Sequence, residues 1–322
     1  MEFANLQKQI KKDGDQEVTL LSDDLDASVT IPTRPLSGAS LWNVATASVR
    51  GLSHEKAGLP CQDSSKWNEL TQDQVIVIAV ADGAGSACLS QVGSDVATQS
   101  VIDFFTTLLD FNWHSASDEA LHTLLRDSVA SGRDQVNEEA LRRNVTVTDL
   151  ATTLIVVVAA PTFVALAQVG DGGAVVQSTS EDIKLLVRPV QGEYINQTDF
   201  ITSNDALSRI QLTVLREEVA GVSAFTDGLQ MLALVYPQAE PFVPFFGPLF
   251  SFVNELASPA DEPQASKRLA EFLLSPAVRQ RADDDLTLAL ATLRPHRDVQ
   301  ENTGAEIKPA PGITEQENEC TL

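Results

Sequence analysis

Four aspartates in this chain lie at the ends of apolar runs that have the length of a β-strand. A carboxylate at the end of a strand can be held rigidly without being buried, and several that converge from different strands form an oxygen-rich pocket. Such a pocket must bind cations or suffer repulsion between its like charges. The pattern therefore predicts a site for hard metal ions, formed by Asp82, Asp171, Asp227 and Asp284.

The composition is that of a globular protein with a large core. The chain has 322 residues, of which 43% are hydrophobic and 21% charged, enough for one large domain or two small ones. The net charge of −23 argues against nucleic acid or an anionic membrane as a partner. Because the N-terminus has no apolar signal segment, we expect a cytoplasmic protein with isolated thiols at Cys61, Cys88 and Cys320.

Polar segments at both ends limit the folded part of the chain. Residues 1–40 are polar with acidic patches, and residues 297–322 carry prolines, glycines and repeated glutamates. Neither segment has enough apolar surface to offset the entropy of ordering. We expect a disordered leader over 1–40, a folded domain over 41–296 and a disordered acidic tail over 297–322.

Periodicity within the folded domain indicates both strands and helices. The run 75–81 has the β-branched content of a fully buried strand, and two helices are expected over 91–111 and 117–142. The apolar runs on either side of Pro161 predict a hairpin. Strands grouped around helical pairs, with hairpins between them, favour an α+β fold with antiparallel sheets.

Each acidic motif is a weak signal when it is taken alone. Three of the four aspartates are followed by glycine, and an Asp-Gly turn is common in hairpins. The fourth, Asp284, stands between Asp283 and Asp285 beside an apolar strand, where like charges cost stability unless a cation or an arginine offsets them. A solvated turn is an alternative reading for Asp283 and Asp285.

Taken in order, the motifs resemble the metal-dependent serine/threonine protein phosphatases of type 2C. The start of the domain, SVRGLSHEKAGLPCQDSS at residues 48–65, is similar to that of a bacterial branch of the family. The resemblance covers about Trp42 to Leu293. The motifs that carry it are Gln62-Asp63, Asp82-Gly83, Thr152-Thr153, Gly170-Asp171, Thr226-Asp227-Gly228 and Asp284-Asp285-Leu286-Thr287.

The resemblance implies a fold and a metal site. The implied fold is a central β-sandwich of two antiparallel sheets flanked by helical pairs, a four-layer α-β-β-α arrangement. Two Mn²⁺ or Mg²⁺ ions would lie at one edge, with Asp82 bridging both and the carbonyl of Gly83 on one. Asp227 and Asp284 would bind the other ion.

Two further aspartates have weaker implied roles. Asp63 would act through bound water, and Asp171 could hold a third ion. The implied reaction is hydrolysis of phosphoserine and phosphothreonine monoesters, because two hard cations lower the pKa of a bridging water and hold the attacking and leaving oxygens in line.

The general acid is unassigned because the chain departs from the family pattern twice. Gln62 stands where many members carry glutamate, and Ala84 stands where eukaryotic members place a histidine that is thought to protonate the leaving alkoxide. Arg50 could hold the phosphate through two hydrogen bonds, and His54 could donate a proton or bind phosphate. A surface salt bridge for Arg50 and a loop or helix-cap role for His54 are alternatives.

Two other functions stay open at this point. A pseudophosphatase would keep the fold as a binding or regulatory module, which the two departures favour and the full set of carboxylates disfavours. A hydrolase of small phosphate esters would differ only in the flap, expected over 191–205. For the main function, the expected partner is a phosphorylated protein, with a cognate serine/threonine kinase or its target, and the chain is expected to be a monomer.

Overall fold

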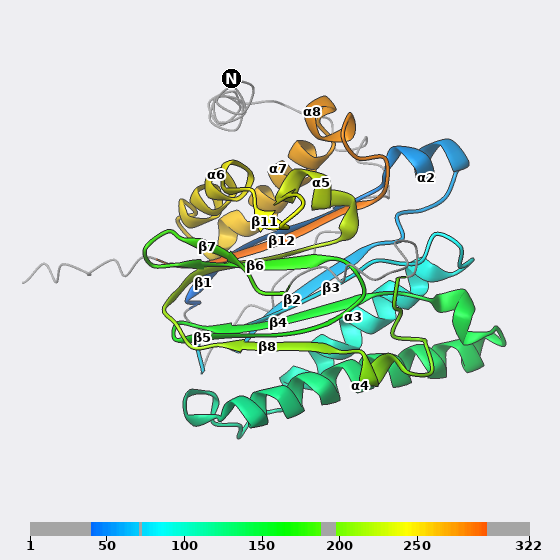
Figure 1. The fold of residues 1–322 in the computed structure, drawn as a ribbon, viewed down its shortest axis with the longest axis horizontal. Coiled ribbons are helices and arrows are strands. Elements are labelled where there is room, and N and C mark those ends of the chain that lie inside the picture. Colours follow the sequence, from blue (N-terminus) through cyan, green and yellow to red (C-terminus); the bar gives the residue numbers. More distant parts are fainter. Residues whose placement is uncertain (1–39, 71–72, 188–197, 295–322) are drawn as a thin grey trace, which may run out of the picture.

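In the computed structural model, two five-stranded antiparallel sheets pack face to face (Figure 1). The structure describes residues 40–70, 73–187 and 198–294. The first sheet runs, in spatial order, through β1 (Trp42–Val49), β12 (Leu286–Leu293), β9 (Val219–Phe225), β6 (Gly173–Ser178) and β7 (Ile183–Leu185). The second runs through β2 (Ser64–Leu70), β3 (Val75–Ala81), β4 (Leu154–Ala160), β5 (Phe163–Val169) and β8 (Gln211–Leu215).

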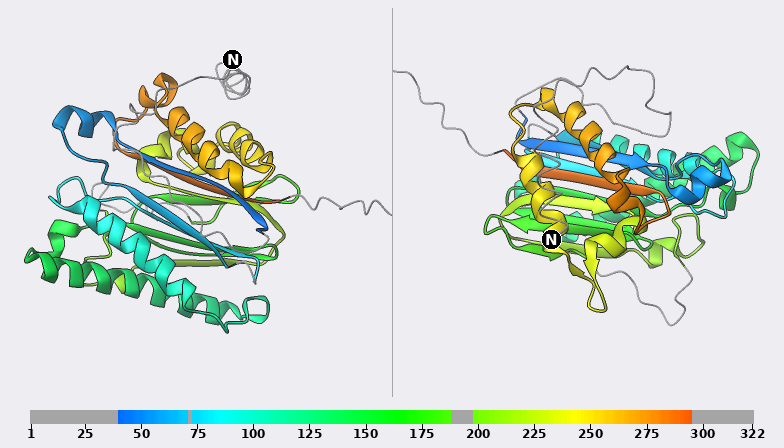
Figure 2. Two further views of the ribbon diagram at one scale, coloured as in Figure 1. Left: turned by 180° about the vertical axis from the view of Figure 1, so that it is seen from behind. Right: turned by 90° about the horizontal axis from the view of Figure 1, so that it is seen from above.

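Helical pairs cover the outer faces of both sheets, as the two views of Figure 2 show. The second sheet is covered by α3 (Ser90–Thr106) and α4 (Asp118–Arg143), and the first by α6 (Val243–Asn254) and α7 (Glu262–Leu273). The predicted four-layer α+β sandwich is thus confirmed. The smaller elements are α2 (Leu52–Ala57), α5 (Gln230–Ala233), α8 (Pro276–Arg279), the hairpin of β10 (Leu234–Val235) and β11 (Glu240–Pro241), and the 3₁₀ turns η1 (Trp113–Ser115), η2 (Val147–Leu150), η3 (Ala206–Ser208), η4 (Asp227–Leu229) and η5 (Pro259–Asp261).

The apolar runs of the central strands arise because both faces of these strands are buried. In β3, the odd-numbered residues from Val75 to Ala81 pack beneath α3 and α4. The even-numbered residues from Ile76 to Val80 pack between the two sheets. A strand with two buried faces has no polar alternation, which is why its sequence reads as a continuous apolar run.

Local signals in the sequence set the ends of the predicted elements. The Ser117 hydroxyl accepts a hydrogen bond from the Ala120 amide (3.2 Å), and α4 ends at Asn144 in the left-handed conformation. The predicted hairpin is confirmed, with Ala160 paired to Phe163. The sequence does not indicate β2 or β8, which are the edge strands of the second sheet, because an edge strand needs less apolar surface than a central one.

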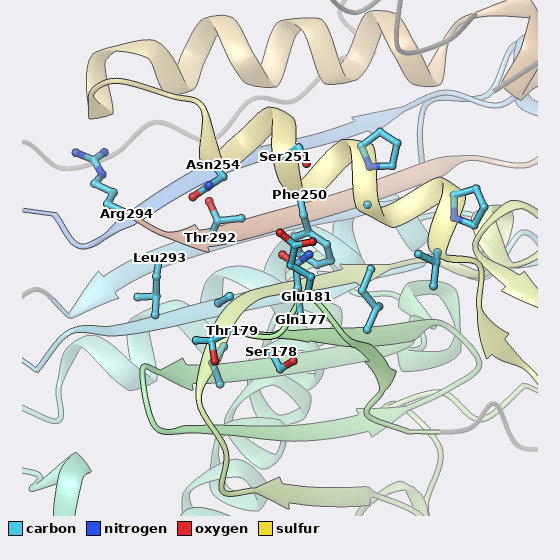
Figure 3. Close-up of a pocket in the computed structure, with 17 residues that line it drawn as sticks. Gln177, Ser178, Thr179, Glu181, Phe250, Ser251, Asn254, Thr292, Leu293 and Arg294 are labelled. Atoms are coloured by element: carbon cyan, nitrogen blue, oxygen red, sulfur yellow. The ribbon is translucent and has the colours of Figure 1, made fainter. Parts of the chain in front are cut away.

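The end of the sandwich at the carboxyl ends of β6 and β12 holds a cavity of about 710 Å³ (Figure 3). It lies between α6 and the turn from β6 to β7, and its wall includes Phe250, Glu181 and Arg294. Asp171 and Asp284 lie just before the other ends of β6 and β12. This cavity is therefore separate from the acidic site.

Several expectations concern residues outside the described ranges. They are residues 1–39 of the leader, the tail over 297–322, the first part of the expected flap, up to residue 197, and Cys320. Cys61 and Cys88 are free thiols, as expected. Within the described ranges, no helix has the length and apolar content needed to cross a membrane.

The crossing of α3 over η2 depends on a glycine. A Cβ at Gly93 would lie 2.1 Å from the carbonyl oxygen of Leu150, so Gly93→Ala should force the two backbones apart. We expect it to lower the free energy of unfolding by about 1–3 kcal/mol, the usual cost of overpacking, measured by urea denaturation.

Gly132 in α4 provides the matched control for this substitution. A Cβ there would lie 3.3 Å from the movable Leu154 side chain and 3.5 Å from the carbonyl oxygen of Ala97, an ordinary van der Waals contact, and alanine adds about 1 kcal/mol of helix propensity. Gly132→Ala should therefore stay within about 1 kcal/mol of wild type. A Gly93→Ala protein as stable as wild type would show that the crossing is not this close.

Candidate metal centre

Strand pairing brings the acidic motifs to one edge of the sandwich (Figure 1). Because β9 is antiparallel to both of its neighbours, its last residue, Phe225, lies opposite Leu288 near the start of β12 and Gly173 at the start of β6. The end of β3, in the facing sheet, reaches the same edge. The predicted ligands that lie together there are Asp82, Asp171, Asp227 and Asp284.

The backbone of Asp82 is fixed by the two threonines that precede β4. The Asp82 amide donates to Thr153 Oγ1 (2.9 Å), and the Asp82 carbonyl accepts from the Thr153 amide (2.8 Å) and from Thr152 Oγ1 (2.9 Å). At Gly83, a Cβ would lie 2.7 Å from the carbonyl oxygen of Gln62. The Thr-Thr and Asp-Gly motifs therefore act together to hold this carboxylate at the end of its strand.

Asp63 presents a buried carboxylate oxygen that is not satisfied. Its Oδ2 accepts a hydrogen bond from Thr226 Oγ1 (2.8 Å), and the same hydroxyl accepts from the Thr287 amide (3.1 Å). Its Oδ1 is buried and has no hydrogen-bond partner. A buried carboxylate oxygen without a donor is costly, and a cation or the water around one would satisfy it.

The electrostatics of the cluster also suit cations. Burial is the main cause that raises the pKa of Asp82 well above its ordinary value of 3.8. The charges of Asp63 and Asp227, and more weakly that of Asp284, add to this rise in pKa. Burial likewise raises the pKa of Asp63, with help from the charge of Asp285, and raises the pKa of Asp227. A divalent cation would reverse this balance by stabilising the charged carboxylates, so these residues fit a hard metal ion.

Asp171 lies at the margin of the cluster, beside Asp227. Its charge contributes to the raised pKa of Asp227. Its Oδ2 accepts a hydrogen bond from Thr198 Oγ1 (2.7 Å), and its carbonyl accepts from the Gln230 side chain. One carboxylate oxygen is thus held by protein, which leaves the other for a ligand.

Asp285 is buried and connects separate segments of the chain, so the reading of a solvated turn is wrong for this residue. It is 3% exposed, and its carboxylate accepts from the amides of Gly51 (2.7 Å) and Gln62 (2.5 Å). Asp283, by contrast, is exposed. Asp285 therefore ties the end of β1 and the loop before β2 to the start of β12.

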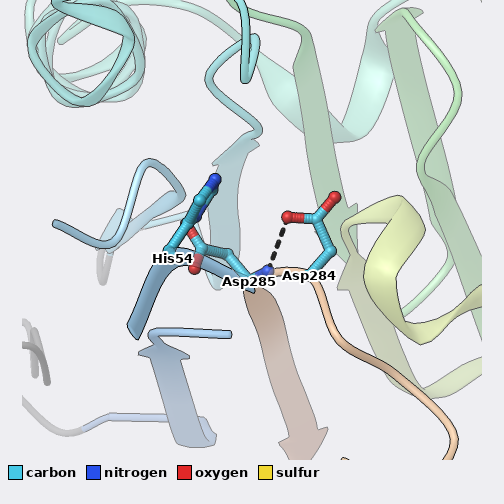
Figure 4. Close-up of side chains that lie close together, drawn as sticks. All are labelled: His54, Asp284 and Asp285. Carbon is cyan, nitrogen blue, oxygen red and sulfur yellow. Dashed lines mark hydrogen bonds and ion pairs between the residues drawn. The ribbon is translucent and has the colours of Figure 1, made fainter. Parts of the chain in front are cut away.

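The preceding residue, Asp284, accepts a hydrogen bond from the Asp285 amide through Oδ1 (2.8 Å), while the Asp285 side chain lies against His54 (Figure 4). Side-chain ligand atoms of His54, Asp284 and Asp285 lie within 4.8 Å of one another. Because Asp285 already accepts two backbone hydrogen bonds, it is a poor metal ligand. Asp284 is exposed and acts on Asp82, so it belongs with the larger cluster.

The two candidate phosphate-binding residues occupy different positions. His54, in α2, places Nδ1 2.9 Å from Asp285 Oδ2, a contact that is an ion pair when the imidazole is protonated. Arg50, after β1, directs Nη1 toward the carbonyl of Leu59 at 3.4 Å. The structure thus joins His54 to the acidic edge through Asp285, and it places Arg50 beside the loop after α2.

Several residues that shape the site were not identified from the sequence. Thr226 lies in a recognised motif, but its partner Asp63 is 163 positions away in the chain. Asp285 and Gly51 are 234 positions apart. Gln230 follows the Asp-Gly motif with no pattern of its own, so only the folded chain reveals these contacts.

Comparison with known proteins identifies a family for this chain. The model of the family described as protein phosphatase 2C matches residues 50–274. A curated relative, serine/threonine-protein phosphatase 3 of Escherichia coli (strain K12), is 36% identical over 256 residues, which are 78% of this chain and 98% of that protein.

Solved structures show the same fold at lower identity. Serine/threonine phosphatase Stp1 from Staphylococcus aureus matches with a TM-score of 0.52 at 14% identity, over 82% of this chain and 100% of that one. The S. agalactiae serine/threonine phosphatase matches with a TM-score of 0.53 at 15% identity, over 79% of this chain and 100% of that one.

The raised pKa values predict how stability without metal depends on pH. The pKa of Asp82 in the folded protein exceeds its ordinary value of 3.8. Protonation of Asp82 therefore stabilises the folded state fully below pH 3.8, and this stabilisation is lost as the pH rises through the folded pKa. Near neutral pH in chelator, Asp82→Asn should be more stable than wild type by roughly 1–3 kcal/mol. The difference should shrink as the pH falls.

Urea unfolding at several pH values, with Asp134→Asn as the control, tests this prediction. Asp134 is exposed on α4, so its substitution removes one charge without relieving the cluster. Added Mn²⁺ should stabilise wild type and the control much more than Asp82→Asn. Equal stability of all three proteins in chelator, with an equal response to Mn²⁺, would contradict the described cluster.

Proposed function

The chain belongs to the protein phosphatase 2C family, and from this premise we propose that it hydrolyses phosphoserine and phosphothreonine monoesters of proteins with two Mn²⁺ or Mg²⁺ ions. Family membership makes it a metal-dependent serine/threonine protein phosphatase, a hydrolase. The observation that carries the detailed proposal is the convergence of Asp63, Asp227 and Asp284 on Asp82, together with the unsatisfied oxygen of Asp63.

The proposed ligands follow from their positions in the cluster. Asp82 suits the bridging position because the other three carboxylates act on it, and Gly83 would add its carbonyl. Asp227 and Asp284 would bind the second ion, and Asp171, which lies beside Asp227, would hold a third. When bound, such ions supply a nucleophilic water near neutral pH and stabilise charge on the phosphoryl group.

The chain's own side chains would orient water and phosphate. Thr226 holds Asp63 so that Oδ1 stays available, and the buried Oε1 of Gln62, which also has no hydrogen-bond partner, would accept from water beside it. The Ala84 methyl group cannot donate a proton. His54 is the better candidate for phosphate binding or proton donation, because its Nδ1 lies 2.9 Å from Asp285 Oδ2, beside Asp284 of the acidic cluster.

Other parts of the function stay predictions. A phosphorylated protein is the substrate class that the family implies, and a cognate serine/threonine kinase or its target is the predicted partner. We also propose that the chain is a cytoplasmic monomer whose folded domain spans residues 41–296. Arg50 stays a second candidate for binding phosphate.

A phosphatase assay tests the proposed activity. Wild type should hydrolyse p-nitrophenyl phosphate and a phosphothreonine peptide with Mn²⁺, and chelator should abolish turnover. Asp82→Asn should lower kcat/KM by at least about 100-fold, because it removes the bridging carboxylate. Turnover that needs no metal and survives Asp82→Asn would refute the site, whereas Mn²⁺ binding without turnover would favour the pseudophosphatase.

Substitution of His54 tests its role separately from its contact with Asp285. In His54→Asn the amide nitrogen takes the place of Nδ1 and keeps the close contact with Asp285, while Nε2 is lost. We expect kcat/KM to fall by roughly 100-fold, the usual size of an acid or base contribution, with little change in thermal stability. Unchanged kcat/KM, together with a loss in Arg50→Gln, would move the assignment to Arg50.

A further inference from the structure

An uncharged stretch of chain leaves the metal centre directly after Asp227. Residues 229–239 contain no acidic or basic side chain, although the whole chain carries a net charge of −23. Met231 is 72% exposed, Val235 46% and Tyr236 38%. Among the described residues, seven large hydrophobic side chains are exposed, and these three lie within six positions of one another.

The segment that carries these three side chains is anchored to the core by their neighbours. Between them, Leu232, Ala233 and Leu234 are buried in the core between the first sheet and its helices, and Val235 pairs with Glu240 in the β10–β11 hairpin. The segment is therefore anchored by one set of side chains and presents another to solvent. Clustered exposed apolar side chains are typical of binding surfaces. We call Met231, Val235 and Tyr236 the apolar ledge.

Hydrogen bonds connect the apolar ledge to the metal centre. The Tyr236 hydroxyl donates a hydrogen bond to Gln230 Oε1 (2.8 Å), and Nε2 of the same Gln230 side chain donates to the backbone carbonyl of Asp171. Burial, and then the charges of Asp171 and Asp227, raise the pKa of Tyr236. These hydrogen bonds place Tyr236, and with it the apolar ledge, next to the metal centre.

We propose that the apolar ledge binds apolar side chains that flank the phosphorylated residue of the protein substrate. The inference rests on the proposed function, which places the phosphate at the carboxylate edge. The side chain of serine or threonine is short, so the substrate backbone must pass over the rim of the site. Each extended residue adds about 3.3 Å, so side chains two or three positions away would reach a surface next to Asp171.

Charge favours an apolar partner over an acidic one at this surface. The cluster and the net charge of −23 repel acidic flanks at short range, and the ledge offers no cation to offset this. Contact with Met231, Val235 and Tyr236 would instead remove apolar surface from water on both partners. The expected preference is for leucine or phenylalanine over serine or aspartate beside the phosphoresidue.

Two phosphothreonine peptides that differ only in their flanking residues test the inference. With the full chain and Mn²⁺, kcat/KM should be roughly 10-fold higher for leucine flanks than for serine flanks, the scale of one well-filled apolar contact. Met231→Ser combined with Val235→Ser should reduce this ratio toward one, and Tyr236→Ala should act in the same direction. Tyr236→Phe should keep the ratio, because the ring stays.

The matched control is Leu141→Ser on α4, which removes an apolar side chain that is 80% exposed and should leave the ratio unchanged. Equal use of both peptides by wild type would overturn the inference while the proposed function stands. Equal losses on both peptides and on p-nitrophenyl phosphate would show that the segment only supports Asp171. A change in oligomeric state without a change in the ratio would identify a contact between copies instead.

A wild type that hydrolyses none of the three substrates with Mn²⁺ would refute the proposed function by itself. The ledge would then be tested by direct binding, with fluorescence anisotropy of the two labelled peptides. Tighter binding of the leucine peptide, lost in the Met231 and Val235 double variant, would support it. Equal binding of both peptides would overturn it.

Discussion

The repulsion between carboxylates that share one buried edge is the constraint on which the site depends. Burial and like charges oppose ionisation of Asp82, Asp63 and Asp227, so the folded chain without metal holds charge that it cannot stabilise by itself. Such a cluster persists only because the surrounding sandwich fixes it. Binding of cations would relieve this repulsion between the carboxylates, and the two sheets supply the rigidity that keeps the carboxylate oxygens together.

The scaffold meets this demand with backbone and hydroxyl contacts around the acids. The Asp285 carboxylate accepts hydrogen bonds from the amides of Gly51 and Gln62, and these bonds join segments that are distant in the chain. Thr226 and Thr153 hold one acidic segment each. Because these donors are neutral, they fix the geometry of the carboxylates without neutralising their charge. The site stays available to a metal ion for that reason.

The sequence predicts most of the sandwich and the members of the acidic cluster. Buried strands such as β3 are readable because both faces are apolar, and α4 is readable because Ser117 and Asn144 mark its ends. The edge strands β2 and β8 are not, because much of their stabilisation comes from a neighbour's backbone. The buried role of Asp285 and the link from Tyr236 to Asp171 through Gln230 were also out of reach, since no local pattern marks them.

What the sequence alone determined is which residues could act: the order of the acidic motifs, their places at the ends of apolar runs, and the departures at Gln62 and Ala84. Only the tertiary structure decided which of these residues meet. Antiparallel pairing sets Phe225 beside Leu288 and Gly173, and that register brings aspartates from separate parts of the chain to one edge. The physical reason is that periodicity records the environment of each side chain, whereas contact between distant residues depends on strand register and on packing of the two sheets.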